Sequence, residues 1–252
     1  MSIGVDLSAL RQEVGIQLRR EHLCPHPELD SEAEQIERLS KLLGMSTKIC
    51  ANAFEGFKAD PLYKDIVQGH RYREGHNVDQ DYTKAAQFYA RAAAKGNPEG
   101  MYNLAKLHEM GKGVKQDFVT SLHWLCMAAE MTPELPFKVV GIAEAQHSLG
   151  LKYNNGVGVQ KDYKEAAKWY EMAVKNGSGP SANNLGILYQ NGTGVDRSLE
   201  KAFHHFKIGA ERQETPAMMN LADCYFMAQG TGSFPATDND WKEGRYVIWI
   251  GI

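Results

Sequence analysis

The stretch YNNGVGVQKDYKEAAKWY, Tyr153–Tyr170, decides the fold. Gly156 and Gly158 interrupt it near its start, and glycine readily adopts the positive φ angle that a helix end requires. Asp162 follows, with Glu165 three residues later, which is typical of the capping box at the start of a helix. The stretch therefore predicts one helix that ends before the glycines, a short turn, and a second helix that begins at Asp162.

The residues on either side supply the apolar faces of these two helices. The first helix is expected over residues 143–155, where Ala145, Leu149 and Tyr153 have helical spacing. The second is expected to end at Gly177. Its apolar residues are Ala166, Ala167, Trp169, Tyr170 and Ala173. Neither helix can bury its apolar face alone, so we expect neighbouring helix pairs to stack on one another.

The same pattern recurs along the chain. The related segments begin at Tyr72, His108, Tyr189 and, in a shortened form, Tyr225. Successive starts, with Tyr153 included, are 36, 45, 36 and 36 residues apart. A constant period with one excess of nine residues predicts an array of helix pairs with one loop insertion. The insertion falls around residues 132–141, where Pro133 and Pro136 disfavour a helix.

The recurring pattern A-x-x-x-L-G-x-x-Y-x-x-G-x-G-V-x-x-D-Y-x-x-A-x-x-W-Y-x-x-A resembles the Sel-1-like repeat, a relative of the tetratricopeptide repeat. The unit quoted above matches it at Ala145, Leu149, Gly150, Tyr153, Gly156, Gly158, Val159, Asp162, Tyr163, Ala166, Trp169, Tyr170 and Ala173. The other units depart from it at single positions, for example Asn77 for the second turn glycine and His205 for the tryptophan. The resemblance covers residues 62–232 and implies an all-α solenoid of stacked antiparallel helix pairs.

Three segments are expected along the chain. Residues 1–60 do not repeat, and their helical patterns suit a helical N-terminal cap or, alternatively, a separate docking segment. Residues 61–232 form the repeat array, with four full repeats and the first helix of a fifth. Residues 233–252 are a degenerate or truncated tail that ends in the apolar YVIWIGI. This tail either folds back onto the last repeat, marks a truncated form, or mediates self-association.

Composition excludes several classes of function. The chain has 252 residues, with 28 Lys and Arg against 31 Asp and Glu, and no basic stripe, so we expect no nucleic-acid binding. No apolar run approaches the ~18 residues of a spanning helix, so we expect no membrane span. No secretory signal is visible, and the four cysteines contain no CxxC pair. We therefore expect a cytoplasmic protein.

Catalytic and metal-binding motifs are not evident. His22, Cys24 and His26 are too tightly spaced for the usual structural zinc pattern and have no second ligand pair nearby. His205 takes an aromatic position of the repeat, which indicates a packed core histidine rather than a general base. No GxSxG motif or phosphate-binding loop is present. We expect a non-enzyme with no metal, cofactor or catalytic residue.

The repeats differ from one another mainly on one face of the first helix. We count positions from its small residue, which is Gly69, Ala105, Gly150, Gly186 and Ala222 in turn. Positions −1 and +3 are nearly constant and should form the buried stripe, and the Asn or Ser at position −2 should make a structural hydrogen bond. Positions −3, +1 and +4, the variable stripe, share one helical face. By the family resemblance, these faces line a concave wall.

We predict that this concave wall binds other proteins or peptides, because a row of exposed apolar groups is unusual on a monomer. The candidate contact residues are Tyr102, Lys106, His147, Leu151, Asn183, Ile187, Met219 and Asp223. The leading hypothesis is a non-catalytic scaffold or adaptor. The alternatives, both suggested by the resemblance, are a regulatory region of a larger enzyme-containing assembly and a hydrolase of small substrates.

Overall fold

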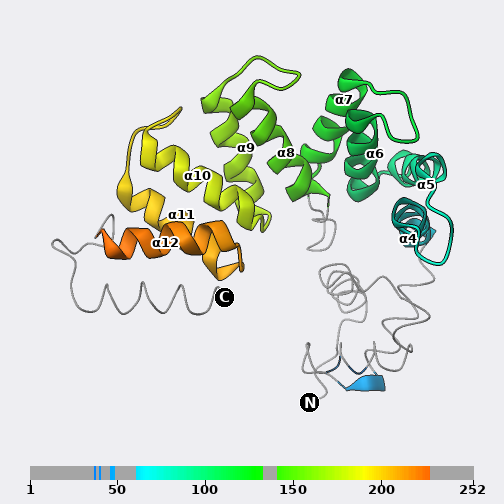
Figure 1. Cartoon of the computed structure of the whole chain (residues 1–252), viewed down its shortest axis with the longest axis horizontal. Helices are drawn as coiled ribbons and strands as arrows, with labels where there is room; N and C mark the ends of the chain where they lie inside the picture. Colours follow the sequence, from blue (N-terminus) through cyan, green and yellow to red (C-terminus); the bar gives the residue numbers. More distant parts are fainter. Residues whose placement is uncertain (1–36, 38–39, 41–45, 49–60, 133–140, 228–252) are drawn as a thin grey trace. The chain divides into compact units, whose positions relative to one another are not determined.

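The computed structural model describes residues 37, 40, 46–48, 61–132 and 141–227. Over these residues the chain forms helices and turns and no strands, which confirms the all-α prediction. The helices are α4 (Pro61–Glu74), α5 (Tyr82–Ala94), α6 (Pro98–Met110), α7 (Phe118–Ala129), α8 (Ile142–Asn155), α9 (Tyr163–Lys175), α10 (Gly179–Asn191), α11 (Leu199–Glu211) and α12 (Thr215–Phe226). They form the antiparallel helix pairs of a solenoid, each with a first and a second helix (Figure 1).

The chain divides into two compact units, which we describe separately. Unit 1 contains α4, α5, α6 and α7 up to Met127. Unit 2 contains α8 to α12 together with residues 128–130. Within unit 1, α5 packs against both α4 and α6. Within unit 2, each second helix packs against its own first helix and the next, and α10 contacts both α8 and α12. The first helices of unit 2 therefore lie side by side.

Several predicted features lie outside the described residues. They include most of the N-terminal cap predicted over residues 1–60, the candidate ligands His22, Cys24 and His26, and the tail over residues 233–252. The predicted loop insertion is described only at its two ends, since α7 ends at Ala129 and α8 begins at Ile142.

Each second helix begins at a polar residue whose side chain binds the exposed amides of the first turn. Asp162 Oδ1 accepts hydrogen bonds from the amides of Lys164 and Glu165, at 2.9 and 3.1 Å. The reciprocal half of the predicted capping box is missing. The Asp162 amide instead donates to the Tyr153 carbonyl at 2.9 Å, and the Glu165 carboxylate binds Lys168. The Tyr153 carbonyl thus accepts the hydrogen bond of the Asp162 amide, which in a capping box would bind the side chain of Glu165.

The turn between the helices of a pair requires left-handed backbone conformations. At the second turn glycine, Gly194 has a φ of 72°, and a Cβ there would lie 2.4 Å from the backbone carbonyl carbon of Tyr163 in the preceding repeat. Asn77 takes this place in the first repeat with a φ of 55°. Asparagine tolerates the left-handed region better than other residues with a side chain, which explains the departure from the pattern.

The small residue of each first helix leaves room for a large side chain of the second helix. Cβ atoms added at Gly69, Gly150 and Gly186 would lie 2.4–2.6 Å from the rings of Tyr89, Tyr170 and Phe206 respectively. These rings are fully buried. In the second repeat the pair is Ala105 and Leu125, both fully buried, so the smaller partner leaves room for a methyl group. Trp169, beside Tyr170, is only partly buried.

The constant positions are buried to different extents. The leucines at position −1 are all buried, as predicted, whereas the residues at position +3 are mostly half-buried. His205 stacks on one of these, Tyr189, with ring centroids 5.4 Å apart and an interplanar angle of 2°. Its Nδ1 atom is buried without a hydrogen-bond partner. Burial lowers the pKa of His205 to about 4. This confirms the prediction of a packed histidine.

Candidate functional site

In unit 2, part of the variable stripe of each first helix reaches solvent. On α10 the half-buried and exposed positions include Ile187 and Gln190, while Leu185, Gly186 and Leu188 are buried. On α8 and α12 the same stripe exposes Leu151, Met219 and Asp223. Because α8, α10 and α12 are neighbours, their stripes together form one surface.

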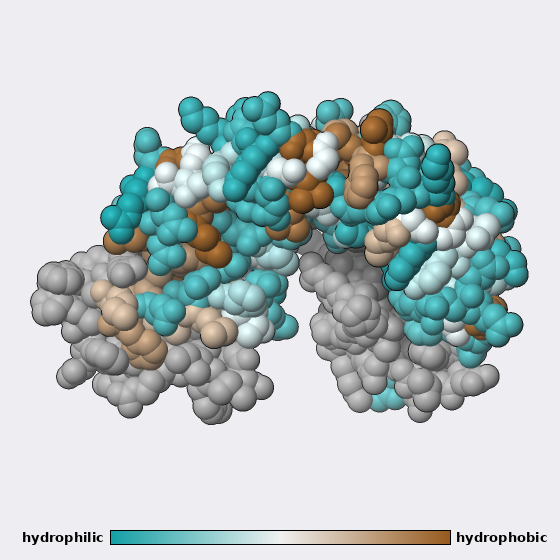
Figure 2. Space-filling model, turned by 45° about the horizontal axis from the view of Figure 1, so that its top comes forward, coloured by the Kyte–Doolittle hydropathy of each residue, from teal (hydrophilic) through white to brown (hydrophobic). Residues whose placement is uncertain are grey.

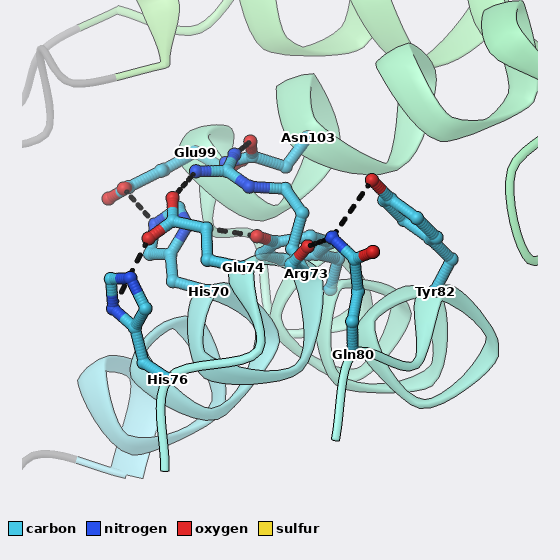
Figure 3. Close-up of polar contacts among 9 residues, drawn as sticks. His70, Arg73, Glu74, His76, Gln80, Tyr82, Glu99 and Asn103 are labelled. Carbon is cyan, nitrogen blue, oxygen red and sulfur yellow. Dashed lines mark hydrogen bonds and ion pairs between the residues drawn. The ribbon is translucent and has the colours of Figure 1, made fainter. Parts of the chain in front are cut away.

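In unit 1 a hydrogen-bond network occupies the corresponding face between α4 and α6. Glu99 Oε1 lies 3.0 Å from Nε2 of His70, whose Nδ1 lies 2.9 Å from the hydroxyl of Tyr89. With the carboxylate accepting from Nε2, the neutral form of the imidazole accepts at Nδ1 from the Tyr89 hydroxyl. Arg73 donates to Asn103 Oδ1 at 2.9 Å (Figure 3). The polar side chains of this face thus hold successive repeats together.

Two predicted contact residues of unit 1 lie on α6, beside this network. Tyr102 is half-buried. The Lys106 side chain is 39% exposed, and its Nζ lies 2.9 Å from Glu109 Oε2, three residues further along the helix. Exposed ion pairs of this kind contribute ~0.2–1 kcal/mol, so the pair leaves the lysine available to a partner.

Two of the asparagines at position −2 make structural hydrogen bonds, as predicted. Asn103 Nδ2 donates to the Glu99 carbonyl at 2.9 Å while its Oδ1 accepts from Arg73. In unit 2, Asn220 Nδ2 donates to Asn183 Oδ1 at 2.7 Å. Both asparagines therefore bind a residue on the first helix of the preceding repeat.

Two of the predicted contact residues in unit 2 are also engaged within the fold. Asn183 is buried, and its Oδ1 accepts the bond from Asn220. His147 Nδ1 lies 2.8 Å from Ser181 Oγ on α10, and burial lowers the pKa of His147. The lowered pKa favours the neutral imidazole, whose Nδ1 can accept a hydrogen bond from the serine hydroxyl. The comparison of variable positions could not reveal the partners Asn220 and Ser181, because both lie outside the variable stripe.

Apart from Asn154 and Gln190, the remaining variable residues of unit 2 form the surface that we call the unit 2 face. Its members are Leu151, Ile187, Met219, Asp223 and Phe226. Met219 is 64% exposed and Leu151 37% exposed. Ile187 and Phe226 are partly buried and pack against the core of unit 2. The face thus has a firmly packed base and two protruding apolar groups.

Charged residues are rare on the first helices of unit 2. The 13 residues of α10 include none, and α12 carries only Asp223. The second helix α9, also 13 residues long, carries Lys164, Glu165, Lys168, Glu171 and Lys175. Figure 2 shows hydrophilic residues over much of the face it presents, with hydrophobic residues in separate patches. Depletion of charge and enrichment of Met characterise the centres of protein interfaces.

Within residues 61–132 and 141–227, no group of three or more His, Cys, Asp or Glu side chains could hold a metal ion. No helix over the same residues is long and apolar enough to cross a bilayer.

Comparison with known proteins places the repeat pattern in a family. The model of the Sel1 repeat matches residues 69–97, 98–133, 143–178, 179–213 and 215–236, which together make up more than half of the chain. Each match within the described residues begins in or beside a first helix, in register with the helix pairs.

Three proteins illustrate the similarity. The chitin synthase regulator SKT5 of Saccharomyces cerevisiae is 31% identical over 108 residues, 42% of this chain and 14% of its own. The ERAD-associated E3 ubiquitin-protein ligase component HRD3B of Arabidopsis thaliana is 44% identical over 50 residues, which are 19% of this chain and 8% of its own. The crystal structure of a protective antigen of uropathogenic Escherichia coli, which displays an SLR fold, aligns with a TM-score of 0.65 and 27% identity over 98% of this chain and 48% of that one. The chain therefore spans a small part of the curated relatives it matches.

Proposed function

Because the chain belongs to the Sel1 repeat family, we propose that it is a non-catalytic adaptor that binds other proteins through the first-helix face of its repeats. The names of two relatives support an adaptor role, since one is a regulator of an enzyme and the other a component of a ligase. The chain spans only 14% and 8% of the length of these two relatives. What the relatives regulate or assemble with is therefore carried over to this chain only as a proposal.

The unit 2 face is the observation that carries this proposal. Its two protruding apolar side chains, Leu151 and Met219, lie on a nearly uncharged surface supported by three packed helices. A rigid surface loses little conformational entropy when a partner binds, so more of the contact energy appears as affinity. Apolar anchors of this kind dominate the energetics of many interfaces. Tyr102 and Lys106 of unit 1 provide a second, more polar contact area in this proposal.

The proposal is tested by comparing three forms of the full chain as baits in a native lysate. The face variant carries Leu151→Gln and Met219→Gln, which remove both protruding apolar groups without adding charge. The control variant carries Val119→Gln and Met172→Gln, which change exposed residues of second helices, 80% and 38% exposed. All forms are matched by circular dichroism. We expect the face variant to lose a discrete set of proteins that the control retains; equal capture by all three baits would refute the proposal.

A second candidate function is a regulatory region of a larger enzyme-containing assembly. The name of the relative that regulates chitin synthase favours it. An enzyme that co-purifies with the wild-type chain, is lost with the face variant and changes its activity when the chain is added back would identify this role. Binding without any change of activity would leave the simple adaptor.

We also propose a cytoplasmic location. Cys224 is a buried free thiol, which is usual in a reducing compartment. Cell fractionation of the untagged protein tests this, and recovery in a membrane-enclosed lumen would contradict it.

A further inference from the structure

We propose that position −3 of the first helices in unit 2 binds the backbone carbonyl groups of an extended peptide segment of a partner protein. His147 on α8 and Asn183 on α10 hold this position, and Met219 holds it on α12. We call these three residues the −3 row. The inference rests on the proposed function, because it specifies the chemistry and the conformation of the segment that the same surface receives.

A chain of hydrogen bonds fixes the tautomer of His147. The amide of Ser181 donates to Ser178 Oγ at 3.2 Å, and the hydroxyl of Ser178 donates to Ser181 Oγ at 2.9 Å. The proton of the Ser181 hydroxyl, which is fully buried, is therefore directed at His147 Nδ1, 2.8 Å away. A neutral imidazole that accepts at Nδ1 carries its own proton on Nε2, so His147 presents an N–H donor there.

The side chain of Asn183 is fixed in a similar way. Its Oδ1 accepts a hydrogen bond from Asn220 Nδ2 at 2.7 Å, which leaves the N–H groups of Asn183 Nδ2 as donors. Among the described residues, neither Asn183 Nδ2 nor His147 Nε2 has a hydrogen-bond partner, and neither is one of the unpaired polar atoms that are buried. Both nitrogen atoms therefore reach solvent, although little of Asn183 is exposed.

Oriented N–H donors without charge are suited to neutral oxygen acceptors. A peptide carbonyl is such an acceptor, but a helix already uses most of its carbonyls for its own hydrogen bonds. A segment in the polyproline II conformation has no internal hydrogen bonds and leaves every carbonyl free. The two donors therefore favour an extended occupant, which is one of the recurring modes of peptide recognition.

The spacing of the two donors suits this conformation. The helices α8 and α10 are in contact, and packed helix axes lie ~8–10 Å apart, so equivalent positions on them are separated by a similar distance. Carbonyls three residues apart in a polyproline II segment are ~9.3 Å apart, whereas carbonyls on the same side of a β-strand are ~6.4–6.8 Å apart. A segment of ~6–7 residues then reaches from His147 to Met219, whose exposed side chain can contact an apolar residue.

The donors disfavour two other occupants of the same surface. A second copy of the chain that used this face would place N–H donors opposite N–H donors, so that these groups lack acceptors. A helix could contact Leu151 and Met219 but would leave both donors unpaired, and imperfectly paired polar groups in an interface cost affinity. An extended segment avoids this cost because its free carbonyls pair with both donors.

The test selects binders from a displayed library of random peptides of about 12 residues, which exceeds the length of the row. The baits are the full wild-type chain and two variants. The donor variant carries His147→Phe and Asn183→Asp, which remove both donors while position 183 can still accept from Asn220. The control variant carries His204→Phe on α11 and Asn155→Asp at the end of α8, both at exposed positions outside the row. We expect affinity to fall about tenfold or more in the donor variant and less than about twofold in the control.

Substitutions in the peptide test the same bonds without altering the protein, so they remain decisive if the donor variant does not fold. A thioamide in place of an amide weakens the acceptor. We expect it to lower affinity about threefold or more at two positions three residues apart, and not to lower it further in the donor variant. Proline between these positions should be tolerated, because the peptide uses its carbonyls and not its N–H groups. Since the bonds join neutral groups, affinity should change little with salt.

Several results would overturn the inference. Selected peptides that bind the donor variant as tightly as the wild type, that require a helical conformation, or that tolerate a thioamide at every position would show that these donors bind no backbone. The absence of any donor-dependent peptide would have the same meaning, and a steep loss of affinity with salt would show a charged ligand instead. The proposed function is judged separately. It survives if lysate capture depends on Leu151 and Met219, and it fails if that capture does not.

Discussion

Replacing Gly150 with alanine tests the packing rule that sets the geometry of every helix pair. A Cβ at this position would lie 2.4 Å from Cε1 and 2.5 Å from Cδ1 of Tyr170, whose ring is fully buried. The ring must move, and overpacking of this kind costs ~1–3 kcal/mol. Alanine also favours the helix over glycine by ~1 kcal/mol, which offsets part of this cost. Taking the upper end of the overpacking cost, ~3 kcal/mol, and subtracting the gain in helix propensity, we expect a net loss of ~2 kcal/mol in the free energy of unfolding.

The second repeat shows how this loss can be reversed. Its equivalent pair is Ala105 and Leu125, so a Tyr170→Leu background should accommodate alanine at position 150. Tyr170→Leu alone removes buried ring atoms and should cost ~2–4 kcal/mol. In that background Gly150→Ala should stabilise the chain by ~1 kcal/mol through helix propensity. The coupling energy between the two substitutions is then ~3 kcal/mol, well above the ~0.5 kcal/mol expected of independent sites.

The assay is urea unfolding of the wild type, both single variants and the double variant, followed by far-UV circular dichroism. The m-values should agree among the four proteins, so that midpoint differences report stability. Additive effects, or a Gly150→Ala substitution that is neutral or stabilising in the wild-type background, would refute the packing rule.

Three further predictions follow from particular residues. His205 has a folded pKa of about 4 against 6.5, so the unfolded state takes up a proton first as pH falls. Stability should thus decline from pH 6.5 to 4 by ~2 kcal/mol, after a discount for partial exposure, and His205→Phe should remove this part of the pH dependence of the urea midpoint. Burial raises the pKa of Cys224 to about 11, so a variant with Cys224 as its sole cysteine should react with a maleimide at pH 8 only after denaturation; rapid labelling of the native protein would contradict this. Gly194→Ala should cost more stability than Gly158→Ala, because an added Cβ meets the backbone of Tyr163 in the first case and nothing within 4 Å in the second; equal midpoints in thermal unfolding would contradict this.

The helix pairs could be predicted closely because they depend on local signals. The first helix predicted over residues 143–155 is observed as α8, Ile142–Asn155, and the predicted cap at Asp162 begins α9. Glycines that end helices and side chains that cap them act within a few residues, so a single repeat contains the information. The fixed period then extends the prediction from one repeat to the others.

The candidate binding face could be predicted only in part. Periodicity placed Leu151 and Met219 on the solvent-reaching stripe, since burial follows the rotation of the helix. It did not reveal that Asn183 binds Asn220 or that His147 binds Ser181, because each bond depends on a side chain from a different helix about 35 residues away. Nor does spacing decide between the adjacent aromatics Trp169 and Tyr170, of which only the second is fully buried.

The most direct test of the central claim is photo-crosslinking from single positions of the full chain in its native lysate. A photoreactive amino acid replaces Met219 or Leu151 on the unit 2 face, or Val119 or Met172 on the second helices, and the adducts are identified by mass spectrometry. We predict that the two face positions yield a shared set of partner adducts and that the two control positions do not. Adducts of the same partners from the control positions alone would contradict the assignment of the unit 2 face as the binding surface.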